Sequence, residues 1–400
     1  MDKPLSGKKI CIVVENLPVP FDRRVWQEAI SLHEAGAEVS VICPKTKNYP
    51  ESQLLLEGIR VFRHPLKEAE RVWEYPFEYF FALFHEFRLL LKIFLKHGRQ
   101  DVIHVCNPPD LLFISALPFF TLTRCKLLFD HHDINPELWL AKYGKKNWGY
   151  HLMVFFERLT FFFASHCIAT NESYKEIAMT RGKKKSEDVT IVRSGPDLSR
   201  LAVGPAKPEV KNGFKFLVGY VGVMGQQEGV DLLLRSVEYI VKKQGRTDIR
   251  FCLMGSGPAI ERLKRLNRSL QLEKYVDFPG RVSNEYLADI LNTADVCVNP
   301  DLPSEMNDKS TMNKIMEYMA FGRPIVQYDL KEGRFSAQES SLYAKNGDTV
   351  DFADKLLWLL DNPEDAKKMG EFGRNRVRST LSWDYEKPKL ISAYKKILGL

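Results

Sequence analysis

Short apolar segments alternate with helical segments along the chain in two rounds, and this alternation constrains the fold more than any other feature. The first round opens at residues 8–15, an apolar β-branched run typical of a buried parallel strand. A helix is predicted at residues 23–36, with Val25, Ala29 and Leu32 on one face. Further strands are predicted at residues 38–44, 59–65, 101–107, 126–133, 166–170 and 189–195. Strands separated by helices in this way indicate a doubly wound α/β domain.

The pattern stops after Gly195 and starts again at residue 214. Residues 196–212 are rich in Pro, Gly, Lys and Ala and are interpreted as a linker. We therefore predict two tandem Rossmann-like domains, residues 1–195 and 213–382, that face each other across a cleft where a ligand binds. The second round consists of strands at 214–222, 249–255, 275–280, 295–300 and 324–329 and helices at 230–243, 259–270, 284–292 and 313–321.

Composition narrows the class of protein. The 400 residues are 44% hydrophobic and 27% charged, which excludes a disordered, fibrous or disulfide-scaffold protein. The net charge of +7 is spread over both halves, so nucleic acid is not a predicted partner. The seven cysteines form no Cys-x-x-Cys pair and indicate buried thiols in a reducing cytoplasm. The N-terminus lacks an apolar signal core, and the longest uncharged runs, 111–123 and 159–171, are shorter than the about 20 residues that span a bilayer.

Aromatic side chains are concentrated at residues 72–97, with Arg88, Lys92 and Lys96 among them. A core helix is the commoner origin of such a pattern. The alternative is a helix that lies in a membrane interface, with aromatic rings at headgroup depth and lysines that reach the water. The basic run at residues 181–185 either supports such a contact or is a solvated loop.

The strongest local pattern lies at residues 299–326, where a strand leads through a polar loop into a helix, Gly322 and another strand. The helix start, from Ser310 to Asn313, would offer backbone N–H groups and a positive dipole end, which suit a diphosphate. Glu317 lies further along this helix, where a carboxylate can accept both hydroxyls of a ribose. A capped helix with no ligand is the simpler interpretation of the same pattern.

Other loops follow predicted strands. Glycines in residues 221–229 permit close approach of the backbone to a ligand or a helix, and residues 255–258 and 278–282 form similar turns. Residues 130–133 read Asp-His-His-Asp at the end of a strand. Because adjacent residues of a strand point to opposite faces, one metal ion would not easily bind both imidazoles, and a single histidine that reaches into the cleft is favoured.

Together these segments resemble the family 4 glycosyltransferases, which have the two-domain glycosyltransferase B (GT-B) fold. The most specific likeness is at residues 317–326, which resemble the family signature Glu-(Ala/Tyr)-Met-Ala-x-Gly-x-Pro-(Ile/Val)-Val. Residues 15–29 are similar to a bacterial branch that builds surface polysaccharides and lipid-linked glycans. The remaining likeness is at residues 21–29, 39–44, 130–133, 221–231, 254–258, 276–282 and 294–300.

The resemblance implies a retaining transfer of a sugar from a nucleotide diphosphate sugar, here expected to be a UDP-sugar, to a polysaccharide or lipid-linked glycan. It implies no metal and no other cofactor, and the sequence contains no Asp-x-Asp pair of the kind that metal-dependent sugar transferases use. Helix N-termini and cations then stabilise the leaving group. The chain is expected in the cytoplasm, with a peripheral contact to an anionic membrane left open.

Family roles are transferred by position. Glu317 would bind the ribose, and the C-terminal helix, residues 383–400, would pack on the first domain. The candidate catalytic residues are His132, Asp308 and Lys309. The candidate donor-binding residues are Gly222, Met224, Gly225, Gln226, Gly255, Gly280, Arg281, Val282, Ser310, Thr311, Met312, Asn313, Lys314 and Glu317. The candidate acceptor-binding residues are Asn16, Phe21, Arg23, Arg24, Asn107 and Asp133.

The sequence departs from the family in its phosphate-binding cations. Val223 and Glu228 stand where an arginine and a lysine are usual, and Lys309 stands where a glutamate is usual. The residues Phe21-Asp22 also lie where paired glycines are usual. We hypothesise that Lys309, Lys314 and Arg334 replace the missing cations. Two alternatives stay open, a sugar-nucleotide 2-epimerase of the same fold and a catalytically inactive nucleotide-sugar-binding subunit.

Overall fold

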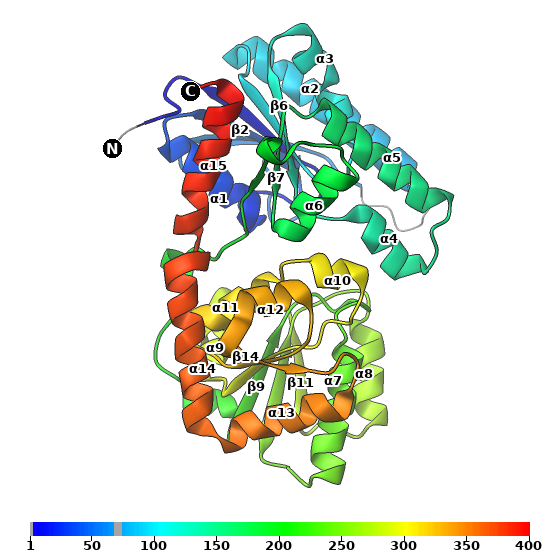
Figure 1. The fold of residues 1–400 in the computed structure, drawn as a ribbon, viewed down its shortest axis with the longest axis vertical. Helices are drawn as coiled ribbons and strands as arrows, with labels where there is room; N and C mark the ends of the chain where they lie inside the picture. The colour runs from blue at the N-terminus through cyan, green and yellow to red at the C-terminus, as the bar shows by residue number, and fades with distance from the viewer. Residues whose placement is uncertain (1–2, 68–73) are drawn as a thin grey trace. The chain divides into compact units, whose positions relative to one another are not determined.

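The computed structural model describes residues 3–67 and 74–400 and divides the chain into two compact units (Figure 1). The first unit comprises Met1–Ser194 and Asp384–Leu400, and the second comprises Gly195–Trp383. Each unit has one sheet with helices between most of its consecutive strands, so the predicted α/β fold with two Rossmann-like sheets is confirmed.

The first sheet has the strand order β3-β4-β2-β1-β5-β6-β7-β8. Neighbouring strands are parallel except β3 and β4, which form an antiparallel hairpin. The sequence did not reveal β3, because it is a four-residue edge strand whose side chains alternate between exposed and half-buried. The strands of the first sheet are β1 (Lys9–Val14), β2 (Glu38–Pro44), β3 (Gln53–Leu56), β4 (Ile59–His64), β5 (Val102–Cys106), β6 (Lys126–His131), β7 (His166–Ala169) and β8 (Val189–Ile191).

Helices cover both faces of this sheet. Right-handed crossovers place α2, α3, α5 and α6 on one face and α1 on the other. The C-terminal helix α15 (Trp383–Leu398) is bound to this unit, since the Tyr394 hydroxyl lies 2.8 Å from Nδ1 of His104 on β5. The remaining helices are α1 (Arg23–Glu34), α2 (Tyr75–His97), α3 (Phe113–Leu122), α4 (Asn135–Tyr143), α5 (Trp148–Phe163) and α6 (Glu172–Thr180).

The second sheet is parallel throughout, with the order β11-β10-β9-β12-β13-β14. Its strands are β9 (Phe216–Val221), β10 (Ile249–Met254), β11 (Val276–Gly280), β12 (Val296–Asn299), β13 (Ile325–Tyr328) and β14 (Ser341–Ala344). Its helices are α7 (Val230–Glu238), α8 (Ile260–Ser269), α9 (Asn284–Thr293), α10 (Glu305–Lys309), α11 (Asn313–Ala320), α12 (Lys331–Ala337), α13 (Thr349–Asp361) and α14 (Pro363–Arg376). Buried apolar side chains form one core on each face of the sheet.

The segment 196–212, predicted as a linker, packs on the second unit. Lys207 Nζ lies 2.9 Å from Asp289 Oδ2, and the Gly204 amide donates to Asn292 Oδ1 at 2.9 Å. The Asn292 side chain of α9 also donates to the Ala202 carbonyl at 2.9 Å and so satisfies backbone groups that a free linker would leave to water.

The aromatic helix is only half-buried. Val72 and Trp73 lie outside the described residues, and α2 begins at Tyr75. Its inward face buries Leu89 and Leu90, whereas Phe84 is 54% exposed. The interpretation as a simple core helix is therefore wrong for the outward face. In the basic run, Arg181 is ion-paired with Glu137 and Glu157, whereas Lys183 and Lys185 are exposed. Within residues 3–67 and 74–400, no helix is long and apolar enough to cross a bilayer.

Candidate functional site

The loops that follow β9, β10 and β11 meet at the carboxyl edge of the second sheet. The Gly222 amide donates to the Met254 carbonyl at 3.1 Å, and the Gly255 amide donates to the Gly280 carbonyl at 2.8 Å. A Cβ atom added to Gly255 would lie 1.8 Å from the Gly222 oxygen. Glycine is therefore required at position 255 by the close approach of two loops, which brings three predicted donor-binding segments together.

The loop that follows β12 joins the same cluster. The Leu302 amide donates to the Gln227 carbonyl at 3.0 Å, and Asn307 Nδ2 donates to the same carbonyl at 2.9 Å. The sequence predicted an irregular loop here, but the structure forms the short helix α10. Ser304 caps this helix, because its Oγ accepts from the Asn307 amide at 3.1 Å.

Helix α11 begins within this cluster, at the predicted position. Met312 is its N-cap residue, and the Met312 side chain makes no capping hydrogen bond. The helix start therefore directs N–H groups and a positive dipole end toward the loops, as an anion site requires. Glu317 is half-buried, one turn after the exposed Asn313 and on the same face. Ser310, Thr311 and Met312 are half-buried beside it.

The other predicted donor-binding residues differ in exposure. Gln226 and Arg281 are exposed, and Gly222, Gly255, Gly280 and Val282 are half-buried at the same edge. Gly225 is buried. The assignment of Met224 to donor binding is wrong, because its side chain lies in the core and both of its backbone groups are used. Its amide donates to the Ser256 carbonyl at 3.0 Å, and its carbonyl accepts from the Ala259 amide at 2.8 Å.

Lys314 occupies a buried position between two carboxylates. Its Nζ lies 2.7 Å from Asp301 Oδ1 and 2.9 Å from Glu228 Oε2, and 5.1 Å from the Tyr220 ring centroid. Burial opposes the charge of the ammonium group, but the carboxylates hold its pKa well above the ordinary value. Burial also raises the pKa of Asp301 to about 7. Lys314 thus places a cation next to position 228, where the family lysine is missing, but its charge is balanced there.

The other proposed phosphate cations are also paired. Lys309 Nζ lies 2.7 Å from Glu305 Oε1, and Arg334 Nη2 lies 2.6 Å from Asp329 Oδ2. Asp308, a candidate catalytic residue, accepts a hydrogen bond from the Lys331 amide at 2.8 Å and so holds the start of α12. The hypothesis that Lys309, Lys314 and Arg334 bind the diphosphate stays a prediction, and it requires exchange of these carboxylate partners for phosphate.

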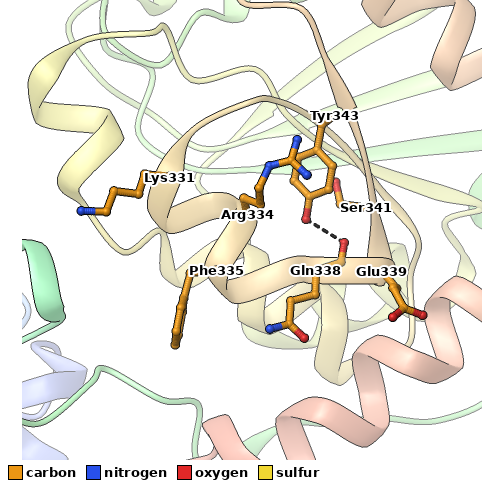
Figure 2. Close-up of a pocket in the computed structure, with 7 residues that line it drawn as sticks. All are labelled: Lys331, Arg334, Phe335, Gln338, Glu339, Ser341 and Tyr343. Carbon is orange, nitrogen blue, oxygen red and sulfur yellow. Dashed lines mark hydrogen bonds between the residues drawn. The ribbon is translucent and has the colours of Figure 1, made fainter.

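A depression of about 720 Å³ lies beside α12 and β14 (Figure 2). The Arg334 guanidinium stacks over the Tyr343 ring at 4.0 Å from its centroid, and the Tyr343 hydroxyl donates to the Gln338 carbonyl at 2.7 Å. Of the predicted residues, Arg334 lines this depression, and α11 does not contribute to it.

The first unit contains a buried ion pair below its own carboxyl edge. Arg24 on α1 donates from Nε to Asp130 Oδ2 at 2.8 Å and from Nη2 to Asp130 Oδ1 at 2.7 Å. A third bond runs from Nη1 to the Val192 carbonyl at 2.9 Å. The assignment of Arg24 to acceptor binding is wrong, because the guanidinium is buried and its other N–H groups face Ser194 Oγ at 3.0 Å and Glu28 Oε1 at 3.2 Å.

His132 is positioned by this pair. Its Nδ1 lies 3.1 Å from Asp130 Oδ2. Burial lowers the pKa of the imidazole, but the Asp130 carboxylate outweighs burial and raises the pKa to about 9. Nδ1–H therefore donates to Asp130 at neutral pH, and Nε2–H is a charged donor on a side chain that is 12% exposed.

Asn107 holds the loop that carries His132. Its Oδ1 accepts from the amides of His132 at 2.9 Å and Asp133 at 3.1 Å, and its Nδ2 donates to Asp110 Oδ1 at 2.9 Å. The assignment of Asn107 to acceptor binding is wrong, because the side chain is buried and its polar atoms are used in the fold. Asn16 is half-buried, and Phe21 and Asp133 are exposed, in the loops that follow β1 and β6. Arg23 is exposed at the first position of α1.

Four groups that could bind a metal lie together in this unit. Glu28, His104, Cys106 and Asp130 are buried, with ligand atoms within 4.8 Å of one another. Arg24 already supplies a cation here, since its Nη2 lies 3.2 Å from Glu28 Oε1. Burial raises the pKa of Glu28, with Asp130 contributing, so Glu28 gives up its proton less readily than an ordinary glutamic acid. The sequence analysis missed Glu28, although its spacing of four residues from Arg24 was a usable signal.

Two family sequence models match the chain, one in each of the two units. The model described as "Glycosyl transferase 4-like domain" matches residues 22–195. The model described as "Glycosyl transferases group 1" matches residues 215–362.

Curated relatives and solved structures agree with these matches. The capsular polysaccharide biosynthesis glycosyltransferase CapM of Staphylococcus aureus is 23% identical over 331 residues, which cover 79% of this chain and 83% of CapM. The D-rhamnosyltransferase WbpZ of Pseudomonas aeruginosa is 25% identical over 166 residues, 41% of either chain. A sucrose-phosphate synthase from Thermosynechococcus elongatus superimposes with a TM-score of 0.80 at 18% identity, over 98% of this chain and 99% of that one. Anabaena HepE, in complex with UDP and glucose, has a TM-score of 0.72 at 13% identity, over 98% and 100% of the two chains.

Proposed function

Because the chain belongs to the glycosyltransferases of GT-B type, we propose that it transfers a sugar from a UDP-sugar to a growing polysaccharide or lipid-linked glycan in bacterial envelope synthesis. The proposed transfer retains the configuration of the sugar and uses no metal ion. The relatives support the class of acceptor, since CapM is named for capsular polysaccharide synthesis. The complex of HepE with UDP supports the donor.

The convergence of four loops around the start of α11 carries the proposal. The loops after β9, β10, β11 and β12 are joined by backbone hydrogen bonds at one edge of the sheet. Departure of a nucleoside diphosphate leaves negative charge on its phosphate, and N–H groups fixed in advance stabilise that charge. We expect Glu317, one turn along the helix and half-buried, to accept the hydroxyls of the ribose.

His132 is proposed to bind a sugar hydroxyl from the edge of the first sheet. As an imidazolium it donates a charged hydrogen bond from Nε2, and the Arg24–Asp130 pair fixes its orientation. A hydrogen-bond donor of this kind aids departure of the leaving group and requires no covalent intermediate on the enzyme.

The reaction can be tested with purified protein and a panel of nucleotide sugars, with and without a glycan or lipid-linked acceptor. UDP release that depends on the acceptor, with an anomeric configuration in the product that matches the donor, is the expected result. Isomerisation of the sugar without UDP release would instead identify an epimerase. Loss of turnover with a chelator and recovery with magnesium or manganese would refute the metal-independent reaction.

A binding subunit without turnover is the second candidate function. The observation that favours it is the pairing of Lys309, Lys314 and Arg334 with carboxylates, which leaves each proposed phosphate cation already neutralised. Calorimetric binding of UDP-sugar with no product in the presence of acceptors would support this candidate. Turnover with any acceptor would exclude it.

We propose that the protein acts in the cytoplasm. All seven cysteines are buried free thiols, a state that a reducing compartment maintains. Location of the expressed protein by cell fractionation tests this assignment.

A further inference from the structure

We propose that the outward faces of α2 and α5 dock the first unit onto an anionic lipid bilayer, with the helices lying parallel to its surface. The inference concerns a binding surface and is independent of the transfer reaction proposed above. It starts from two exposed apolar stripes that the fold does not use.

The stripe on α2 runs along one side of the helix. Its apolar members are Phe77, Phe80, Phe81, Phe84, Leu91 and Leu95, with exposures from 40% to 78%. At 3.6 residues per turn these positions fall within a sector of roughly 100°, and they extend for about 27 Å along the axis. The buried residues Ala82, Glu86, Leu89, Leu90 and Ile93 occupy the opposite side of the helix. The outward stripe is therefore a continuous apolar surface and not a scatter of single residues.

Helix α5 repeats the arrangement. Trp148 is 76% exposed, Leu152 41%, Phe155 51% and Phe162 74%, and their spacing again places them on one side of the helix. The buried Glu157 lies on the opposite side.

Aromatic contacts join the two helices through α3, on one side of the sheet (Figure 1). Phe94 of α2 lies 4.5 Å from Phe119 of α3, and Phe113 of α3 lies 5.3 Å from Phe163 of α5, measured between ring centroids. Both stripes thus belong to one rigid layer of three helices.

The charges beside the stripes indicate what covers them. Arg88 is exposed within the α2 stripe, and Lys92 and Lys96 lie along its edge. The exposed Lys145 and Lys146 precede Trp148, and Arg158 is exposed on α5. The carboxylates of α2 are the half-buried Glu78 and the buried Glu86.

Phenylalanine and tryptophan at an apolar surface bordered by lysine and arginine match the interface of an anionic bilayer. A second copy of the chain fits less well. A symmetric contact through the stripe would set the cations Arg88, Lys92 and Lys96 of two copies against one another. Since no described helix can cross a bilayer, the layer would lie on the membrane surface.

The test uses the full-length protein and two kinds of vesicle, phosphatidylglycerol mixed with phosphatidylcholine, and phosphatidylcholine alone. Flotation should show binding to the anionic vesicles that weakens at high ionic strength. The triple variant Arg88→Gln/Lys92→Gln/Lys96→Gln should lower the partition coefficient by about 100-fold at low salt. The charge-matched control Lys243→Gln/Lys367→Gln/Lys368→Gln, on exposed lysines of the second unit, should bind as the wild type does.

The apolar contribution is tested separately. Phe80→Ser/Phe81→Ser/Phe84→Ser should abolish flotation without lowering the melting temperature, because these rings are exposed. Leu55→Ser, at a 70% exposed leucine on β3, is the control. In a Phe84→Trp variant, brominated lipids should quench the introduced tryptophan more strongly than they quench the wild-type protein.

Four results would overturn the proposal. They are flotation that does not depend on anionic lipid, stripe variants that bind like their controls, no added quenching in Phe84→Trp, and stripe variants that change only the oligomeric state in sedimentation. The last result would assign the surface to a second copy of the chain.

Discussion

The pKa of His132 makes a quantitative prediction about stability at alkaline pH. The Asp130 carboxylate outweighs burial and raises this pKa from 6.5 to about 9 in the folded chain. A group with a raised pKa binds its proton more tightly in the folded state than in the unfolded state. The resulting stabilisation is complete below the unfolded pKa near 6.5 and is lost as the pH rises through about 9.

The size of the effect follows from the same difference. A change from 6.5 to about 9 corresponds to about 3 kcal/mol, because each pKa unit is worth about 1.4 kcal/mol. For a unit of roughly 200 residues, each kcal/mol of lost stability lowers the melting temperature by about 2–4 °C, so the melting temperature should fall by about 6–12 °C. His132→Gln removes this contribution, so the variant should lose less stability than the wild type between about pH 7 and about pH 10.

Calorimetry of both proteins across this pH range, with NMR titration of the His132 ring, measures the effect. His151→Gln, at an exposed histidine on α5, is the matched control and should behave as the wild type does. Burial also raises the pKa of Glu28 to about 8. Glu28 therefore adds a further loss of folding stability as the pH rises, and this loss is the same in the wild type and the control. A His132 pKa near 6.5, or equal pH dependence in wild type and His132→Gln, would refute the reasoning.

Three further predictions concern the second unit. Lys314→Met should destabilise the protein by about 3–5 kcal/mol, because two carboxylates lose their buried cation, and Lys314→Met/Asp301→Asn should recover part of this loss in calorimetry. Lys309→Ala should raise the donor KM or lower kcat by about 10-fold, about 1.4 kcal/mol, and unchanged donor kinetics would exclude Lys309 from phosphate binding. Glu317→Gln should raise the KM for the donor by about 10-fold or more, and titration calorimetry that finds the same affinity for UDP in this variant and the wild type would contradict the role of Glu317 at the ribose.

Much of the fold could be predicted because the spacing of apolar residues along the sequence indicates strands and helices. Apolar runs predicted every strand of the described residues except β3 and β14. The predicted helix at residues 313–321 differs from α11 by one residue at its C-terminal end. The order of strands and helices also located the loops of the candidate donor site, since the carboxyl ends of parallel strands meet at one edge. Neither missed strand is a continuous buried run, since the side chains of β3 alternate between exposed and half-buried and the two central residues of β14 are half-buried.

The sequence by itself therefore determined the two α/β rounds, the helix that starts the candidate donor site and the loops around it. The tertiary structure decided which charges meet. Arg24 and Asp130 are 106 positions apart, and Lys314 and Glu228 are 86 apart. It also decided that the aromatic face of α2 is exposed. The physical reason is that periodicity shows which residues share a face of an element, whereas the partner of that face is set by the packing of distant segments.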